Sequence, residues 1–305
     1  MIIMDLSQIA IAAVIMQTVG PDGVDSVEEG MVRHVILDSI RSNYMQFKNE
    51  YGDLVIAVDG KNIWRKKYFQ YYKARRASDR KKSDFDWDSF FVHLNTIKEE
   101  LKEYFPYNVI DIVGAEADDV IGTLCKYYGN EELIVKNELI LILSGDGDFQ
   151  QLQKYLNVRQ YSPTLNKYIV CNNPREYLKR HIIKGDRSDG IPNFLSPDNC
   201  IVIGERMKSI FETKLNVWVN QKPEEFCESN TTQLYNYKRN QKLIDLDLIP
   251  EEIYNDILDE YHFNKDNPKI EGYDGFNKLK QKNKFMQYFI DHKLTVLSQK
   301  MTDFI

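Results

Sequence analysis

The chain has 305 residues, of which 43% are hydrophobic and 12% aromatic. This length and composition fit a globular protein with a sizeable core, either one large domain or a domain with an extension. The formal net charge of −6 excludes a protein covered in positive charge, although a local basic patch remains compatible with nucleic-acid binding.

The amino-terminal segment is apolar, but its pattern is not that of a signal peptide. Residues 1–16 contain no basic residue, Asp5 interrupts them, and no apolar run in the chain approaches the roughly 18 residues that span a bilayer. The four cysteines form no CxxC pair, which favours reduced core thiols over disulfides or a zinc site. We therefore expect a cytoplasmic protein without membrane attachment.

Strand-like and helix-like segments alternate through the first half of the chain. Apolar strand-like runs occupy 1–6, 54–58, 109–113 and 139–143, and amphipathic helix-like segments occupy 31–49, 87–104 and 117–128. This βαβα alternation predicts a parallel sheet with helices on both faces. Two further strand-like segments follow at 158–161 and 167–170, and the chain from Pro174 onward is mostly helix-like. We expect loops at 18–26, 221–232 and 266–275.

Acidic residues follow each of the four main strand-like runs. Because ligands bind at the carboxyl ends of parallel strands, these side chains should converge in one cleft. A fifth acidic group, in the motif GDRSDG, follows a helix-like segment and is expected to fold over the same edge of the sheet. The residues in question are Asp5, Asp59, Glu116, Asp118, Asp119, Asp146, Asp148, Asp186 and Asp189.

A single aspartate after a strand is explained by helix capping, but this number of carboxylates in one cleft is not. Two carboxylates roughly 6 Å apart repel each other by about 3 kcal/mol at an effective dielectric constant of 20. Hard oxygen ligands without a suitable His or Cys favour Mg²⁺ or Mn²⁺ over zinc, and the five histidines show no metal-ligand spacing. An EF-hand calcium site at 145–148 is disfavoured because the following FQQLQKYL lacks the later oxygen ligands. Two divalent ions would suit phosphodiester hydrolysis.

A basic segment follows Asp59. Residues 64–82, WRKKYFQYYKARRASDRKK, carry nine Lys or Arg residues and one acid, with aromatic residues interleaved. Cationic groups suit phosphates and aromatic faces suit the bases of a single strand, whereas the alternative is a solvated helix face with ordinary core aromatics. The chain contains no glycine-rich phosphate loop, so neither an ATPase nor a dehydrogenase is expected.

The order of these motifs resembles the 5′-nuclease (flap endonuclease) family, and most of all its ribonuclease H members from T-even-type phages. The resemblance covers 1–192 and is carried by MDLSQIA, MVRHVILDSI, AVD, WRKKYFQYYKARR, EADDVI, SGDGDFQQL and KGDRSDGIP. It implies an α/β fold in which a parallel central sheet is flanked by helices, a 5′-nuclease (PIN-like) core with a mainly helical C-terminal part. The implied domains are a core at 1–184, with a basic helical arch at about 60–86, and a duplex-binding part at 185–305.

The resemblance also implies a function. The expected enzyme is a magnesium-dependent 5′→3′ exonuclease and flap endonuclease that removes RNA primers and adjoining DNA on the lagging strand by two-metal hydrolysis. Two Mg²⁺ ions, for which Mn²⁺ is expected to substitute, would be held by Asp5, Asp59, Glu116, Asp118, Asp146, Asp148, Asp186 and Asp189. The family uses the position of Asp119 less for metal binding.

By the same resemblance, Lys73 and Arg76 would contact the scissile phosphate. Past Pro192 the chain departs from the family pattern, with Gly204 and Lys208 as the only remnants of a hairpin and helix that grip the duplex, so a monovalent-ion site there is in doubt. The full set of expected nucleic-acid contacts is Arg65, Lys66, Lys67, Tyr72, Lys73, Arg75, Arg76, Arg206 and Lys208.

The expected substrates are RNA–DNA hybrids and 5′-flap or nicked DNA. Single-stranded DNA-binding protein or a sliding clamp are the partner proteins expected of a monomeric replication enzyme, located in the host cytoplasm if phage-encoded. The lysine-rich residues 278–284 would contact DNA or a partner, or form an exposed helix face.

Two alternatives stay open. A phosphatase of the haloacid dehalogenase type also gathers aspartates at strand ends, but it needs a DxD pair after the first strand, where this chain has Asp5-Leu6-Ser7. The other alternative is a non-catalytic structure-specific DNA-binding protein. It is disfavoured because such a protein would have no need of the intact set of acids.

Overall fold

A six-stranded sheet forms the centre of the computed structural model, which describes residues 1–18, 27–129, 138–267 and 282–305. The strand order is β3-β2-β1-β4-β5-β6; the first five strands run parallel and β6 pairs antiparallel with β5. The predicted parallel sheet is thus confirmed, with one antiparallel edge strand added. The strands are β1 (Ile2–Asp5), β2 (Leu54–Ala57), β3 (Asn108–Ile110), β4 (Ile140–Leu143), β5 (Val158–Ser162) and β6 (Lys167–Ile169).

The central strands are apolar throughout because both of their faces are covered. In β1, Ile2 and Met4 pack into one core cluster while Ile3, which points the other way, packs into a second. All three are completely buried. Burial of each such side chain stabilises the fold by roughly 1.5–3 kcal/mol. The sheet is therefore a rigid platform whose strand ends hold a fixed spacing.

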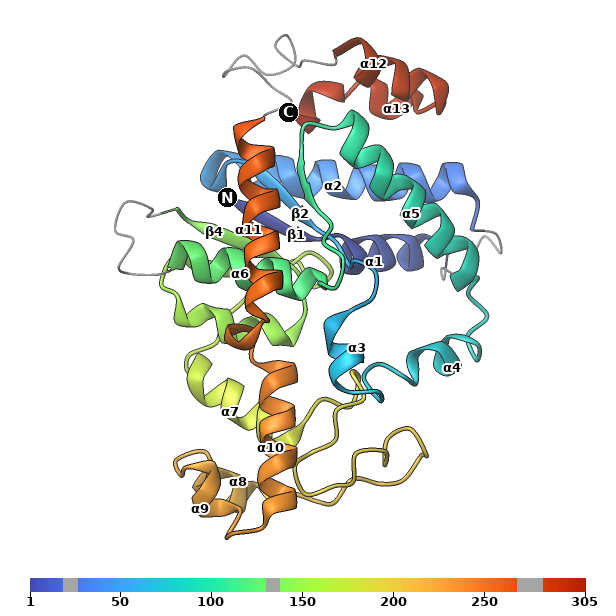
Figure 1. The fold of residues 1–305 in the computed structure, drawn as a ribbon. Coiled ribbons are helices and arrows are strands. Elements are labelled where there is room, and N and C mark those ends of the chain that lie inside the picture. The colour runs from blue at the N-terminus through green and yellow to red at the C-terminus, as the bar shows by residue number, and fades with distance from the viewer. Residues whose placement is uncertain (19–26, 130–137, 268–281) are drawn as a thin grey trace.

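Helices from both halves of the chain cover the two faces (Figure 1). One face carries α1 (Leu6–Thr18), α2 (Glu29–Tyr51), α5 (Trp87–Tyr104) and, from the C-terminus, α12 (Lys282–Asp291), α13 (Thr295–Ser298) and the 3-10 helix η5 (Met301–Phe304). The other face carries α6 (Ala117–Gly129), the 3-10 helices η2 (Gly147–Lys154) and η3 (Leu246–Leu248), and α11 (Glu251–Asp266). Both helical layers were expected, but their sharing by the two halves of the chain was not.

A third core cluster lies beyond the carboxyl edge of the sheet. It contains α7 (Pro174–Lys184), α8 (Glu212–Trp218), α9 (Pro223–Phe226) and α10 (Thr231–Ile244). Ile63, Phe69 and Tyr72 of the basic segment complete this cluster. The basic segment itself forms two short helices, α3 (Trp64–Tyr68) and α4 (Arg76–Arg80), which lie apart from the sheet in Figure 1. The base of the arch is therefore anchored in the C-terminal helical layer.

Some expected boundaries differ from the structure. The third strand ends at Ile110 rather than at 113, because the chain turns there. In this turn the Ala115 carbonyl accepts from Gly60 N–H, and the Gly114 carbonyl accepts from Trp64 N–H. The expected loop at 221–232 contains the short helix α9. Most of the loops expected at 18–26 and 266–275, and residues 278–281 of the lysine-rich stretch 278–284, lie outside the described residues.

Cys125, Cys200 and Cys227 are buried, and Cys171 is half-buried. Among the described helices, none is both long and apolar enough to cross a membrane.

Candidate metal and nucleic-acid site

The strand order creates a switch point between β1 and β4, because the chain continues from β1 toward one edge of the sheet and from β4 toward the other. Such a crevice at the carboxyl ends of the strands is the usual ligand position of an open α/β sheet. Asp5 is the last residue of β1, and Asp146 follows the end of β4. The buried Ser144 hydroxyl accepts from Asp146 N–H at 3.2 Å and donates to Asp5 Oδ2 at 3.4 Å. The two strand ends therefore meet, as the sequence predicts.

Asp59 and Asp118 join these two acids. Asp59 accepts hydrogen bonds from Ala117 N–H at 3.1 Å and from the Ser7 hydroxyl at 2.9 Å, which ties the end of β2 to the starts of α6 and α1. Asp118 lies in the first turn of α6. Burial raises its pKa well above the usual range, and the neighbouring Glu116, Asp146 and Asp5 raise it further, although Lys73 opposes them.

The pKa of Asp5 is raised by its position among these carboxylates. Its exposed fraction is 7%. Burial, followed by repulsion from Asp59, raises its pKa to about 7, and Asp146 adds to this effect. No described residue forms a salt bridge with any of the four acids Asp5, Asp59, Asp118 and Asp146. We call these four the unpaired acids.

Two other acids of the set lie beside cations of the basic segment. Lys73 Nζ lies 2.6 Å from Glu116 Oε1 and 3.5 Å from Asp189 Oδ2, and Arg76 lies 2.6 Å from Asp189 Oδ1. The Tyr72 hydroxyl bridges the same two carboxylates at 2.9 and 3.0 Å. Although burial opposes it, Lys73 and then Arg65 lower the pKa of Glu116. These contacts bring Lys73 and Arg76 to the cluster, where the sequence places them.

Arg65 and Asp119 form a buried pair behind this group. The Arg65 guanidinium donates to Glu116 at 3.0 Å, to Asp119 at 2.9 Å and to the Leu243 carbonyl at 2.9 Å, and only 2% of the residue is exposed. Asp119 is fully buried and also accepts from Glu116 N–H. Arg65 and Asp119 therefore fix the position of Glu116 instead of facing solvent.

Burial corrects part of the expected nucleic-acid surface. Arg65 and Tyr72 lie inside the protein, so neither is retained as a direct contact; Trp64 and Phe69 are buried as well, and are ordinary core aromatics. Tyr68, in contrast, is 49% exposed. The cations that remain accessible are Lys66, Lys67, Arg76, Arg206 and Lys208, which are exposed, and Arg75, which is half-buried and donates to Ile201 O at 3.2 Å.

The turn after α7 brings Asp186 and Asp189 to the cluster and docks the arch. Gly185 has φ +67° and a Cβ there would lie 2.4 Å from Ile191 O, so only glycine fits. Asp186 Oδ1 then accepts from Ser188 N–H at 2.7 Å and from Asp189 N–H at 3.1 Å. Lys73, itself at φ +54°, donates its N–H to Asp189 O at 2.7 Å. The strained backbone at Lys73 is therefore held by the turn that carries Asp189.

Asp148 and Asp186 flank a histidine, His181, that the sequence analysis did not predict to belong to the site. His181 on α7 lies between Asp148 and Asp186, with Nδ1 3.3 Å from Asp148 Oδ1 and Nε2 3.2 Å from Asp186 Oδ2. Burial raises the pKa of Asp148 to about 7, and Asp146, Asp189 and Asp186 contribute, whereas His181 opposes the shift. Asp186 lies only five residues after His181, whereas Asp148 belongs to η2, so the group of three could not be predicted from local spacing alone.

The eight acids therefore fit divalent cations. Four of them form no salt bridge with a described side chain, and burial, with repulsion from neighbouring carboxylates as a further cause, raises the pKa values of Asp5 and Asp148 to about 7. The donors are almost all oxygen atoms, which suits Mg²⁺ and Mn²⁺. The unpaired acids, with Asp148 and Asp186 beside them, would hold such ions, which would supply an activated water and stabilise a leaving oxygen.

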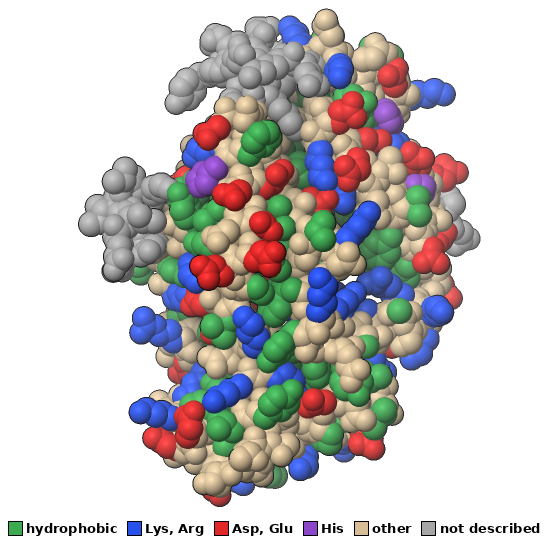
Figure 2. Space-filling view, in the orientation of Figure 1, with side chains coloured by type: hydrophobic (Ala, Val, Ile, Leu, Met, Phe, Trp, Pro, Cys, Tyr) green, Lys and Arg blue, Asp and Glu red, His purple; other side chains and the backbone are tan. Residues whose placement is uncertain are grey.

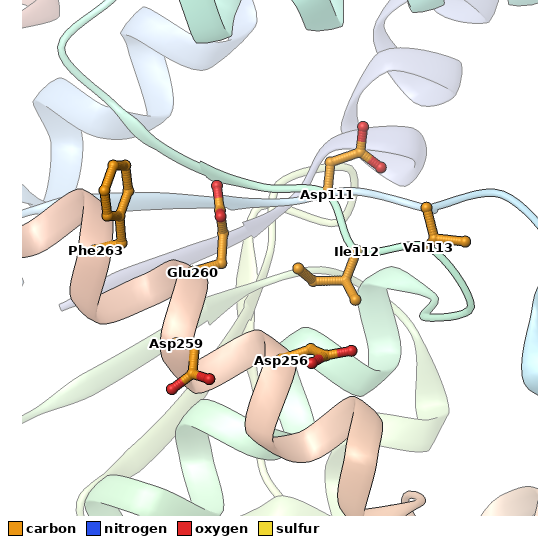
Figure 3. Close-up of a pocket in the computed structure, with 7 residues that line it drawn as sticks. All are labelled: Asp111, Ile112, Val113, Asp256, Asp259, Glu260 and Phe263. Atoms are coloured by element: carbon orange, nitrogen blue, oxygen red, sulfur yellow. The ribbon is translucent and has the colours of Figure 1, made fainter.

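A separate groove of about 500 Å³ lies between α11 and the segment after β3 (Figure 3). Its lining contains none of the eight acids. In Figure 2, acidic side chains gather over the upper part of this face, whereas Lys and Arg are more frequent below. The groove and the acid cluster are thus different features. The groove is lined by Asp111, Ile112, Val113, Asp256, Asp259, Glu260 and Phe263.

Comparison with known sequences identifies relatives along the whole chain. Residues 26–180 match the family model of the 5′-3′ exonuclease N-terminal resolvase-like domain, and residues 176–304 match the C-terminal domain model of T4 RNase H. Ribonuclease H of Enterobacteria phage T4 is 31% identical over 99% of this chain and 95% of its own length. A 5′-3′ exonuclease of Buchnera aphidicola is 29% identical over 53% of each chain.

Solved structures share the fold at low sequence identity. The bacteriophage T5 flap endonuclease, in a pseudo-enzyme–product complex with DNA and metal ions, superposes with a TM-score of 0.60 at 16% identity, over 86% of this chain and 98% of that one. The T5 protein co-crystallised with metal ions gives a TM-score of 0.58 at 17% identity, over 85% and 98% of the two chains. With the acid cluster at the switch point and both halves of the sequence matched, the chain belongs to the 5′-3′ exonuclease family of nucleases, together with ribonuclease H of phage T4.

Proposed function

We propose that this nuclease is a magnesium-dependent 5′→3′ exonuclease and flap endonuclease that removes RNA primers and adjoining DNA during lagging-strand synthesis. The observation that carries the proposal is the group of unpaired acids at the ends of adjacent strands, directly beside the arch cations Lys73 and Arg76. Two divalent ions held by this cluster would activate a water molecule and stabilise the leaving 3′ oxygen of a phosphodiester. Mn²⁺ would substitute for Mg²⁺.

The arch cations have a defined role in this proposal. Lys73 and Arg76 now neutralise Glu116 and Asp189, and a substrate phosphate at the cluster would share the same cations. Arg76 is the more accessible, since 44% of its side chain is exposed against 13% for Lys73. Their charge would stabilise the phosphoryl oxygens in the transition state.

The remaining accessible cations would contact the nucleic-acid backbone. Lys66, Lys67 and Arg75 lie on the arch, and Arg206 and Lys208 lie on the loop that Arg75 touches through Ile201 O. We propose that these residues bind the 5′ strand and the duplex of an RNA–DNA hybrid or of 5′-flap or nicked DNA. Replication proteins such as a single-stranded DNA-binding protein or a sliding clamp would direct a monomeric enzyme to these ends, in the host cytoplasm if the gene belongs to a phage.

The experiment is a cleavage assay on a labelled 5′-flap DNA duplex and on a nicked RNA–DNA hybrid, with and without Mg²⁺. We expect Mg²⁺-dependent release near the junction. Asp146→Asn should lower the rate by at least about a hundredfold, since it removes a metal ligand while its side-chain oxygen still accepts from Asp148 N–H. Asp53→Asn, an exposed acid at the opposite end of the sheet, is the matched control and should cleave normally.

The alternatives give different results in the same assay. Binding of the flap without cleavage at any Mg²⁺ concentration would favour a structure-specific DNA-binding protein. Hydrolysis of a small phosphomonoester, without cleavage of either nucleic acid, would favour a phosphatase. The second outcome is disfavoured by the structure, because α1 begins at Leu6, directly after Asp5, and the DxD pair that a phosphatase of that type needs is missing.

A further inference from the structure

His181 adds imidazole nitrogen atoms to one part of the acid cluster, whereas the unpaired acids offer only oxygen atoms. Its two ring nitrogens lie 3.3 Å from Asp148 Oδ1 and 3.2 Å from Asp186 Oδ2. One ligand atom from each of the three residues lies within 4.8 Å of the other two. No other described histidine belongs to such a group.

The position of the ring is fixed by its surroundings. His181 lies in the last turn of α7, which Gly185 terminates by donating its N–H to His181 O at 2.8 Å. Tyr177, one turn earlier, stands edge-on to the imidazole with ring centroids 6.0 Å apart. The side chain is only 16% exposed. The imidazole is thus built into the cluster, between η2 and the turn that carries Asp186.

The distances suit shared coordination of one ion. Ligand atoms at roughly 2.0–2.2 Å from a metal ion lie roughly 3.0–3.5 Å from each other in octahedral or tetrahedral geometry. Each carboxylate oxygen lies within this range of the ring nitrogen that faces it, 3.3 Å from Nδ1 for Asp148 and 3.2 Å from Nε2 for Asp186. An ion would take one of the two nitrogens, and one ligand atom from each of the three residues lies within 4.8 Å of the others.

Imidazole and carboxylate ligands select different metals. Mg²⁺ prefers oxygen ligands and near-ideal octahedral geometry, whereas imidazole nitrogen suits first-row transition ions. The unpaired acids Asp5, Asp59, Asp118 and Asp146 offer oxygen only. The two parts of the cluster therefore differ in the ion that they favour.

We propose that His181, with Asp148 and Asp186, forms a mixed nitrogen–oxygen site that binds a first-row transition ion such as Mn²⁺ in preference to Mg²⁺. The proposal rests on the proposed function in so far as both place metal ions on the same carboxylates. It goes beyond that function because it assigns a nitrogen ligand and a metal preference to one position. The opposing possibility is that His181 holds the two carboxylates by hydrogen bonds alone.

The test uses the full chain without nucleic acid and takes Mn²⁺ as the probe. Pulsed electron paramagnetic resonance of the Mn²⁺-loaded protein detects nitrogen bound to the metal, and calorimetric titration gives the affinities for Mn²⁺ and Mg²⁺. We expect nitrogen coupling in the wild-type protein and in His34→Gln, a half-buried histidine on α2 that serves as the control. His181→Gln should lose the coupling and weaken Mn²⁺ binding at one site by about tenfold or more, with little change for Mg²⁺.

Two outcomes would overturn the inference. Absence of nitrogen coupling in the wild-type protein would do so without any reliance on a variant that must fold. Equal weakening of Mn²⁺ and Mg²⁺ binding by His181→Gln would show that the imidazole only positions the carboxylates. Flap cleavage in Mg²⁺ by the same wild-type preparation would show that the proposed function survives either result, whereas a protein that binds neither ion would refute both.

Discussion

Neutralising Asp5 should make the metal-free protein more stable while destroying its activity. The Asp5 carboxylate is 7% exposed, and burial together with Asp59 raises its pKa from 3.8 to about 7. A shift of about three pKa units corresponds to about 4 kcal/mol of folding free energy. Asn keeps the shape of the side chain and the oxygen that accepts from Gln8 N–H at 3.1 Å. Asp5→Asn therefore removes the charge, and the only hydrogen bond that must reverse is the one from the Ser144 hydroxyl at 3.4 Å, which would accept from the Asn amide.

The direction of the effect with pH follows from the raised pKa. Below about pH 3, under the unfolded pKa of 3.8, Asp5 is protonated in both the folded and the unfolded chain, and the wild-type protein bears no penalty. As the pH rises from 4 through 7, the unfolded chain ionises first, and the folded state loses stability until the penalty reaches its full value. Without metal, Asp5→Asn should therefore exceed the wild-type protein in free energy of unfolding by about 4 kcal/mol at pH 8 and by about 2 kcal/mol at pH 5.

Urea denaturation in EDTA at the two pH values measures both differences, with Asp53→Asn as a control expected to stay within about 0.5 kcal/mol of the wild-type protein. Mg²⁺ should narrow the difference at pH 8 to about 1 kcal/mol, because an ion that binds only the folded state stabilises the wild-type protein by about 2.7 kcal/mol at a hundredfold excess over Kd. A variant no more stable than the wild-type protein at pH 8 in EDTA would refute the idea that these acids repel one another until metal binds.

Further predictions concern the groups that hold the cluster in place. Arg65→Met should lower the free energy of unfolding by about 3–5 kcal/mol, because it leaves Glu116 and Asp119 buried without their guanidinium partner. Lys66→Met, at an exposed position, should change it by less than about 0.5 kcal/mol. Comparable losses in the two variants would contradict the stabilising role of the Arg65 salt bridges. Gly185→Ala should lower the melting temperature far more than Gly52→Ala. Both glycines have positive φ, but only a Cβ at position 185 would meet backbone atoms, at 2.4 and 2.6 Å. Equal shifts in melting temperature would show that backbone strain at position 185, and not this steric clash, determines the effect. Lys67→Ala should weaken the binding of flap DNA similarly for all sequences. It should also reduce the slope of the logarithm of the binding constant against the logarithm of the salt concentration by about one, measured by fluorescence anisotropy across a salt series. An unchanged slope would show that Lys67 does not contact the DNA.

The positions of the strand-end acids could be predicted because they follow from sheet geometry alone. Short apolar runs that alternate with helical segments are typical of parallel strands buried on both faces, and the carboxyl ends of parallel strands lie along one edge. Asp5, Asp59 and Asp146 meet there for that reason. The helix over 87–104 was predictable from its amphipathic spacing, and the structure has it at the same bounds.

The fate of the basic segment could not be predicted from composition. Arg65 and Lys66 are neighbours of similar chemistry, yet one is buried against Glu116 and Asp119 and the other is exposed. The difference arises because Ile63, Phe69 and Tyr72 pack into the third core cluster and turn one side of the segment inward. Local sequence gives the charge of such a segment, whereas tertiary packing decides which charges face solvent.

Packing of the arch also explains why the cluster contains both paired and unpaired acids. The acids that the arch reaches, Glu116, Asp119 and Asp189, lie off the strand ends and are neutralised by Arg65, Lys73 and Arg76. The sheet holds most of the unpaired acids at its rigid edge, where the fold prevents them from moving apart to relieve their repulsion. Since the described cations form salt bridges with one group and with none of the other, most of the uncompensated charge is concentrated at the switch point. That is where a divalent ion would gain the most free energy on binding.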